Sequence, residues 1–176
     1  MNRTRHRSNA VFSARAHLAA LLVTALAGLV LAACGLAGAS EDELAQAEAA
    51  WQAAPLASYH VVVEVQRPQE RRRHEVWVRD GEIVSGTLQY GQDGQGWGPP
   101  QPVETAQAAP FTVPGLFATV REQMRYANRL FVRVQLSDTP PFPRRIVLGP
   151  VRQDGMPVEG TETTVDVRLL EPLPPP

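Results

Sequence analysis

The spacing of hydrophobic residues predicts two amphipathic helices. The first follows the capping box Ser40-x-x-Glu43 and ends before Pro55. Its apolar stripe consists of Leu44, Ala47, Trp51 and Ala54. The second begins after the N-cap residue Thr112 and has the clearest amphipathic pattern in the chain. Its stripe consists of Val113, Leu116, Phe117, Val120, Met124 and Ala127. We expect both stripes to pack against a sheet, with Trp51 anchoring the first helix.

Six other segments alternate apolar and polar residues with a period of two, which predicts strands. They are residues 58–66, 73–79, 82–90, 130–136, 144–148 and 163–169. The dipeptide Asp80-Gly81 suits a type I′ turn, because both central residues of that turn need a positive φ. The resulting hairpin would place Val78 opposite Ile83. It would also place Trp77 opposite Val84.

The order of these elements predicts an α+β domain over residues 41–170. A helix, three strands, a long loop, a second helix and three further strands indicate an antiparallel sheet of about six strands with two helices packed on one face. Residues 67–71 would turn between the first two strands, residues 91–110 would form the long loop, and residues 149–160 would form a turn-rich connection. Residues 171–176 would be an extended, Pro-rich tail.

The first 33 residues have the pattern of a secretory signal peptide. Residues 1–17 carry four arginines and no acidic residue, and residues 18–31 are an uncharged segment rich in Leu and Ala. A membrane-spanning helix needs roughly 20 apolar residues. Because the uncharged segment is shorter than that, we expect residues 1–33 to be cleaved rather than to remain as a transmembrane anchor.

The end of this segment, Leu31-Ala32-Ala33-Cys34, resembles the lipobox of bacterial lipoproteins. The resemblance implies that Cys34 becomes the mature N-terminus and carries diacylglycerol, with a further acyl chain such as palmitate on its amine in many bacteria. Two or more chains anchor a protein stably, whereas one binds only marginally. Residues 34–40 would then be a short tether on the extracytoplasmic face of the cell membrane, or of an outer membrane if the cell has one. The alternatives are a buried structural thiol or a soluble secreted protein that is cut near a cysteine.

The mature part resembles a family of uncharacterised bacterial secreted proteins and lipoproteins of unknown function, over most of residues 48–170. The resembling features are the helix that ends at Trp51 before Tyr59, the hairpin of residues 78–84, the helix start Thr112 to Phe117, the strand Val132 to Leu136, and Phe142-Pro143 before Ile146. The resemblance implies a fold and supplies no activity.

Charge and residue inventory exclude several classes of function. Without the leader the chain would keep 13 of its 17 basic residues against all 18 acidic ones, a formal net charge of −5. This balance disfavours nucleic-acid binding. Only His60 and His74 would remain, which excludes a three-histidine zinc site, and there is no G-x-S-x-G motif or P-loop. We therefore expect no metal, no cofactor and no enzymatic activity. His74 would face Glu64 across the first hairpin, which favours a surface ion pair over acid/base chemistry.

Candidate binding residues lie in the long loop and in the single run of basic side chains. They are Trp97, Asp93, Arg71, Arg72 and Arg73. Trp97 is either an exposed stacking platform or an aromatic that pins the loop to the domain, which is the simpler interpretation. Asp93 belongs to a turn with too few carboxylates for calcium. The three arginines either contact lipid headgroups or a cell-wall anion, or they form a solvated hairpin.

Three functions remain open at this point. The first is a membrane-anchored, non-catalytic binding or interaction module, whose partner is an envelope protein or a small ligand. The second is a carrier or sensor of an apolar ligand held between sheet and helix. The third is a hydrolase with an unrecognised site, which would need carboxylates that converge in one cleft.

Overall fold

The computed structural model describes residues 38–53, 56–92, 96–126 and 130–174, and within them an α+β fold. The helices are α2 (Glu41–Ala53), α3 (Thr105–Ala108), the 3₁₀ turn η1 (Ala109–Phe111) and α4 (Val113–Met124). The strands are β1 (Tyr59–Arg67), β2 (Glu70–Arg79), β3 (Glu82–Gln92), β4 (Gly96–Trp97), β5 (Gln101–Pro102), β6 (Val132–Leu136), β7 (Pro143–Leu148), β8 (Arg152–Gln153), β9 (Met156–Pro157) and β10 (Thr163–Pro172). No helix among the described residues is long and apolar enough to cross a membrane.

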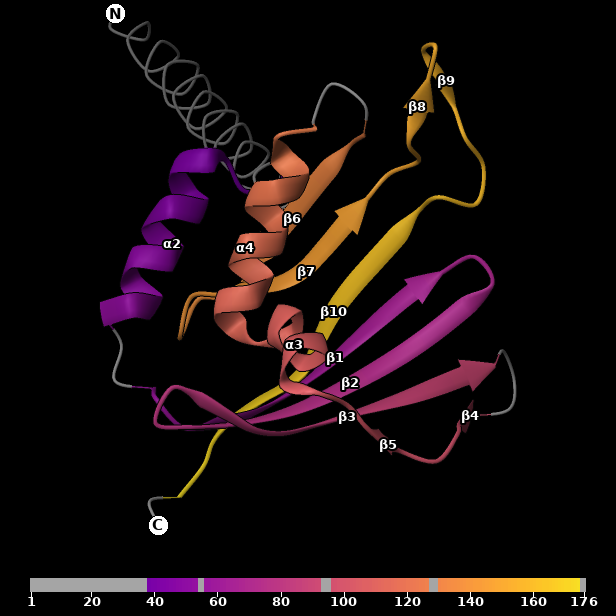
Figure 1. The fold of residues 1–176 in the computed structure, drawn as a ribbon. Helices are drawn as coiled ribbons and strands as arrows, with labels where there is room; N and C mark the ends of the chain where they lie inside the picture. The colour runs from indigo at the N-terminus through magenta and orange to yellow at the C-terminus, as the bar shows by residue number, and fades with distance from the viewer. Residues whose placement is uncertain (1–37, 54–55, 93–95, 127–129, 175–176) are drawn as a thin grey trace, which may run out of the picture. The chain divides into compact units, whose positions relative to one another are not determined.

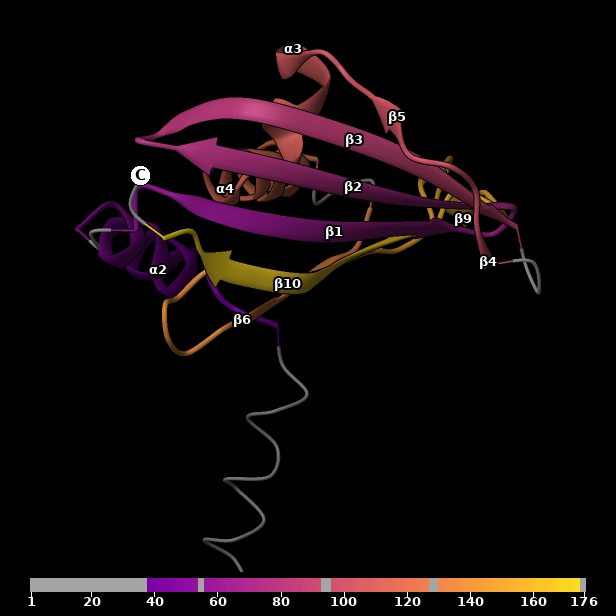
Figure 2. The ribbon, with the colours of Figure 1, turned by 90° about the horizontal axis from the view of Figure 1, so that it is seen from below.

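Eight strands form one antiparallel sheet in the order β4-β3-β2-β1-β10-β7-β6, with β5 beside β3, and β8 and β9 form a separate hairpin. The last strand, β10, lies between β1 and β7, so it joins the first three strands to the later ones. Figure 2 shows β3, β2, β1 and β10 side by side, with α4 behind them. The α+β class is confirmed, and the strands are more numerous than expected.

The hydrophobic core lies between one face of the sheet and the helices. Helix α4 crosses β6 and β7, and α3 with η1 covers β2 and β3 (Figure 1). Phe117, Leu116 and Ile146 are among the largest side chains that are fully buried in the described domain. Gly86 lets α3 approach the sheet, because a Cβ at this position would lie 2.9 Å from the Cβ of Ala108.

Helix α2 begins and docks as its sequence indicates. The backbone N–H of Ser40 donates to Glu43 (2.8 Å) and that of Glu43 donates to the Ser40 hydroxyl (3.3 Å), which is a capping box. The ring of Trp51 meets the ring of Tyr59 edge to face at 5.7 Å and the ring of Phe142 at 6.4 Å. Trp51 therefore anchors the helix in the core.

The register of the first two hairpins differs from expectation. Asp80 and Gly81 both have positive φ and Val78 pairs with Ile83, but Trp77 pairs with Ser85 because a bulge follows. The turn between β1 and β2 contains only Pro68 and Gln69, not residues 67–71. A shift of one residue moves a side chain to the other face of a sheet. His74 consequently pairs with Val63 rather than with Glu64, which pairs with Arg73.

Three segments are more ordered than the sequence suggests. The stretch 91–110 is not a long loop, because it contains the end of β3, the short strands β4 and β5, and α3. The connection 149–160 is closed by the β8–β9 hairpin, whose turn residues Asp154 and Gly155 have positive φ. The expected tail at 171–176 begins as strand, since Glu171 and Pro172 still pair with β1. Backbone pairing between strands accompanies each of these differences: β4 and β5 pair with β3, β8 with β9, and β10 with β1.

Candidate functional site

The face of the sheet opposite the helices is polar. Directly paired residues of antiparallel strands point to the same face. One row of paired residues crosses six strands, and its members are Gln89, Arg73, Glu64, Asp166, Arg145 and Gln135. We call this surface the outer face. The residues next to Glu64 in β1, Val63 and Val65, point into the core.

Ion pairs connect the middle of this row. The carboxylate of Glu64 lies 2.8 Å from Nη2 of Arg73 and 2.7 Å from Nε of Arg168. Asp166 lies 3.5 Å from Nε of Arg145. Burial raises the pKa of Glu64, but hydrogen bonds from Arg73 and Arg168 outweigh it and leave the pKa below its usual value. Glu64 is therefore an ionised partner of arginines and is poorly suited to act as a general acid.

Trp97 lies on the outer face at one edge of the sheet, in contact with two arginines of β2. The Cζ atoms of Arg71 and Arg73 lie 4.8 Å and 4.6 Å from the centroid of the Trp97 ring. Gly91 pairs with Trp97 and makes room for the indole, because a Cβ at Gly91 would lie 3.0 Å from the ring. The amide of Gln89 donates to the carbonyl of Gly98 (2.8 Å) and fixes the following turn.

The structure brings together three of the five candidate binding residues: Trp97, Arg71 and Arg73. Arg72 points to the opposite face, where its guanidinium lies over Tyr90 and pairs with Glu70 at 2.8 Å. Asp93 lies outside the described residues.

A hollow of about 390 Å³ opens on the outer face beside this cluster. It is lined by Gln66, Arg67, Pro68, Arg145, Glu162 and Thr164. Gln66 pairs with Arg71 in the neighbouring strand, so the hollow and the Trp97 cluster are continuous. A guanidinium stacked on an aromatic ring keeps its in-plane N–H donors available for a carboxylate or a phosphate. Because Arg73 and Arg145 already pair with Glu64 and Asp166, the guanidinium of Arg71 is the group of this surface best placed to bind an anionic group.

His60 is the centre of a second cluster on the outer face, which the sequence did not reveal. Its ring stacks on Trp77 with centroids 4.6 Å apart, and its Nδ1 lies 3.1 Å from Glu171. Its Nε2 lies 3.8 Å from Glu75. The carboxylates of Glu171 and Glu75 thus lie near different nitrogens of the His60 ring. In the described part of the chain, no group of three or more His, Cys, Asp or Glu side chains is arranged to hold a metal ion.

His74 is buried in the core, so the expected pairing with Glu64 on the surface is wrong. The residue is 6% exposed, and its ring stacks on Phe111 with centroids 3.4 Å apart. Neither ring nitrogen has a hydrogen-bond partner among the described residues. Burial, assisted by the charge of Arg72, lowers the pKa of His74 to about 4. His74 is therefore neutral at neutral pH and is a structural residue.

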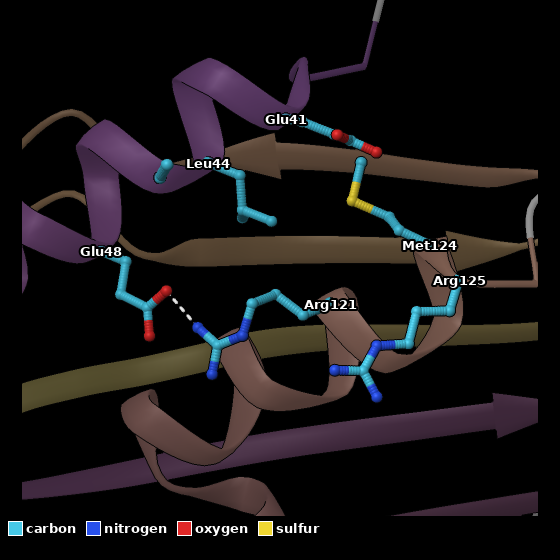
Figure 3. A pocket seen from close by; sticks show the side chains of 7 residues that line it. Glu41, Leu44, Glu48, Arg121, Met124 and Arg125 are labelled. Atoms are coloured by element: carbon cyan, nitrogen blue, oxygen red, sulfur yellow. Dashed lines mark hydrogen bonds and ion pairs between the residues drawn. The ribbon is translucent and has the colours of Figure 1, made fainter.

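A groove of about 310 Å³ separates α2 from α4 (Figure 3). Its lining is apolar at Leu44, Ala45 and Met124. Charged side chains complete it: Glu41, Glu48, Arg121 and Arg125. Glu48 and Arg121 form an ion pair across it. Because the two walls come from helices far apart in sequence, the helical patterns alone did not indicate this groove.

Comparisons with protein-family models, with curated protein sequences and with solved structures find no match. The resemblance to a lipoprotein family of unknown function therefore stays a prediction, and the function has to be inferred from the geometry of the chain itself.

Proposed function

We propose that this protein is a lipid-anchored, extracytoplasmic binding protein without catalytic activity, and that it holds an anionic partner on the outer face of its sheet. The partner would be a carboxylate- or phosphate-bearing component of the cell envelope. The lipid anchor is inferred from Cys34 and its flanking residues.

The observation that carries this proposal is the stacking of Arg71 and Arg73 on Trp97, next to a hollow that contains Arg67 and Arg145. The mature chain is acidic overall, so a local surface with several guanidinium groups is unusual for it. The hollow of about 390 Å³ falls in the size range of small-ligand sites, roughly 300–1,000 Å³.

The same surface disfavours a hydrolase. Glu64 and Asp166, which pair across β1 and β10 on the outer face, both form ion pairs with arginines. A general acid needs a pKa near the working pH, and the pKa of Glu64 is lowered. Reproducible turnover that a Glu64→Gln or Asp166→Asn substitution abolishes would overturn the non-enzymatic assignment.

The test measures binding of polyphosphate and of poly-γ-glutamate to the full lipidated protein in an uncharged detergent, by calorimetry at physiological salt. These two probes separate phosphate from carboxylate recognition. We expect Arg71→Gln to weaken binding by about tenfold, the effect of losing a charge-assisted contact. Arg72→Gln is the matched control, because it removes the same charge from the adjacent residue on the opposite face.

Equal losses in the Arg71→Gln and Arg72→Gln variants would show that only net charge matters, and would contradict a site on the outer face. Failure of the wild-type protein to bind either probe would overturn the proposal that it binds an anionic partner. Trp97→Leu should also weaken binding, because the guanidinium groups lose the ring that orients them.

The groove between α2 and α4 favours a second candidate, a carrier of a small amphiphile. Leu44 and Met124 offer apolar surface for a short chain, and Arg121 and Arg125 offer charges for its headgroup (Figure 3). An Ala45→Phe variant would fill the groove. If this variant loses binding of dodecanoate and keeps binding of polyphosphate, the groove is a separate ligand site; unchanged dodecanoate binding would exclude it.

A further inference from the structure

Exposed hydrophobic side chains gather in one part of the chain. Five of the eight large hydrophobic residues that are exposed among the described residues fall between residues 126 and 158. They are Tyr126, Phe131, Val151, Met156 and Val158. Met156 is 70% exposed and Phe131 is 56% exposed. Single exposed hydrophobic residues are normal on a protein surface, whereas a group of them indicates an interaction site.

Backbone contacts connect the members of this group. The N–H of Gly149 donates to the carbonyl of Phe131 (2.7 Å), which places Phe131 at the point where the chain leaves β7 for the β8–β9 hairpin. The N–H of Val158 donates to the carbonyl of Val151 (2.8 Å) and closes that hairpin. Figure 1 shows the end of α4, the start of β6 and the hairpin at the same end of the domain. We call this end the hairpin end.

The chain enters the domain next to β6. The N–H of Ala39 donates to the carbonyl of Val134 (2.8 Å), and Gly38 packs closely against Arg133. Three residues lie between Cys34 and Gly38, so four Cα-to-Cα steps connect them. An extended chain covers at most about 3.5 Å per step, and the tether therefore reaches no further than about 14 Å. A lipidated Cys34 would hold β6 within that distance of the bilayer surface.

We propose that the hairpin end inserts its exposed hydrophobic side chains into the membrane interface, so that the domain is held in one orientation on the bilayer. This inference rests on the lipid anchor of the proposed function. The partner of this apolar surface is the lipid bilayer, because the short tether brings the apolar side chains near β6 to the level of the headgroups.

The charges at the hairpin end suit this arrangement. The guanidinium of Arg133 lies 5.3 Å from the centroid of the Phe131 ring. Arg152 is exposed in β8, which pairs with β9, the strand that contains Met156. An aromatic ring covered by an arginine can place its apolar edge among acyl chains while the guanidinium stays at the level of the phosphates. A few hydrophobic side chains suffice to orient the domain on the bilayer, since the acyl chains on Cys34 supply most of the free energy of membrane binding.

The orientation has a consequence for the candidate site. Strands β6 and β4 are the two ends of the main strand order, and six strand spacings of about 4.8 Å separate them along the sheet, roughly 29 Å in total. With β6 at the membrane, the cluster of Trp97 and Arg71 would lie at the far edge and face the space beyond the bilayer surface.

The experiment uses single cysteines, which is practical because the only native cysteine, Cys34, is blocked by lipid. Met156→Cys and Phe131→Cys variants of the lipidated protein are labelled with a nitroxide and reconstituted in vesicles of phosphatidylethanolamine and phosphatidylglycerol. Val84→Cys is the matched control, because Val84 is as exposed as Phe131 (both 56%) but lies in β3, close to the β2–β3 turn. Power saturation with oxygen and with a water-soluble nickel complex measures the depth of each label.

We expect the labels at 156 and 131 to lie about 5–10 Å below the headgroup surface and the label at 84 to stay in water. Vesicle flotation tests the lipid anchor separately from the insertion of the hairpin end. Protein that fails to float has no anchor, and both proposals on the membrane fall with it. Protein that floats while the labels at 156 and 131 are as accessible to nickel as the label at 84 overturns the insertion and leaves the anchor intact.

Discussion

The buried histidine makes the stability of this protein depend on pH in a way that can be calculated. His74 has no hydrogen-bond partner among the described residues for either ring nitrogen, and its pKa falls from 6.5 in the unfolded chain to about 4 in the folded one. Because the pKa is lower in the folded state, the unfolded chain takes up a proton first as the pH falls. The contribution of neutral His74 is therefore complete above pH 6.5 and is lost between pH 6.5 and pH 4.

The size of the effect follows from the shift. One pKa unit corresponds to about 1.4 kcal/mol, so a shift from 6.5 to about 4 is worth up to about 3 kcal/mol, most of which is lost by pH 4.5. The total free energy of unfolding of a domain is only about 5–15 kcal/mol. Urea unfolding at pH 7.5 and pH 4.5 should therefore show a clear loss of stability.

Carboxylates also titrate in this range, so the comparison needs a variant without the imidazole. His74→Phe keeps a ring against Phe111 and removes the titrating group. We expect the difference in free energy of unfolding between this variant and the wild type to change by about 2–3 kcal/mol between the two pH values. A difference that stays constant, or an imidazole proton resonance of His74 that titrates near pH 6.5, would refute the explanation by burial.

The other predictions concern the anchor, the core and the candidate site. Cys34→Ser should yield an uncleaved precursor, and incorporation of radiolabelled fatty acid into that variant would contradict lipidation. Phe117→Ala should lower the free energy of unfolding by about 3–5 kcal/mol, because Phe117 is completely buried; a melting temperature within a degree or two of the wild type would be incompatible with this packing. Gly91→Val should displace the Trp97 ring and weaken polyphosphate binding to the level of Trp97→Leu; an unchanged dissociation constant would contradict a role for the ring.

Features that depend on residues within one element could be derived from the sequence. The stripe of Leu116, Phe117 and Val120 predicted the buried face of α4, and the capping box at Ser40 predicted the start of α2. Asp80-Gly81 predicted a turn with positive φ at both residues. Helix periodicity, capping and turn preference are decided by interactions over a few residues, so each is visible in a short stretch of chain.

The candidate site depended on contacts that no short stretch reveals. The turn between β1 and β2 is one residue shorter than the turn that would pair His74 with Glu64. This difference shifts the register, so that His74 enters the core and Arg73 pairs with Glu64 on the outer face. Arg168 reaches Glu64 because β10 inserts beside β1, more than a hundred residues away in sequence. Trp97 and the run Arg71 to Arg73 were recognisable as residue types, but not as neighbours.

The sequence by itself thus determined the class of fold, the faces of its main helices and the chemistry available for binding. Tertiary structure decided which side chains meet: it divided the arginine run between two faces, turned the presumed loop 91–110 into two strands and a helix, and left the polar outer face opposite the helices. The physical reason is that strand order and register are set by packing and hydrogen bonds between distant segments. Local preferences restrict these contacts without selecting among them.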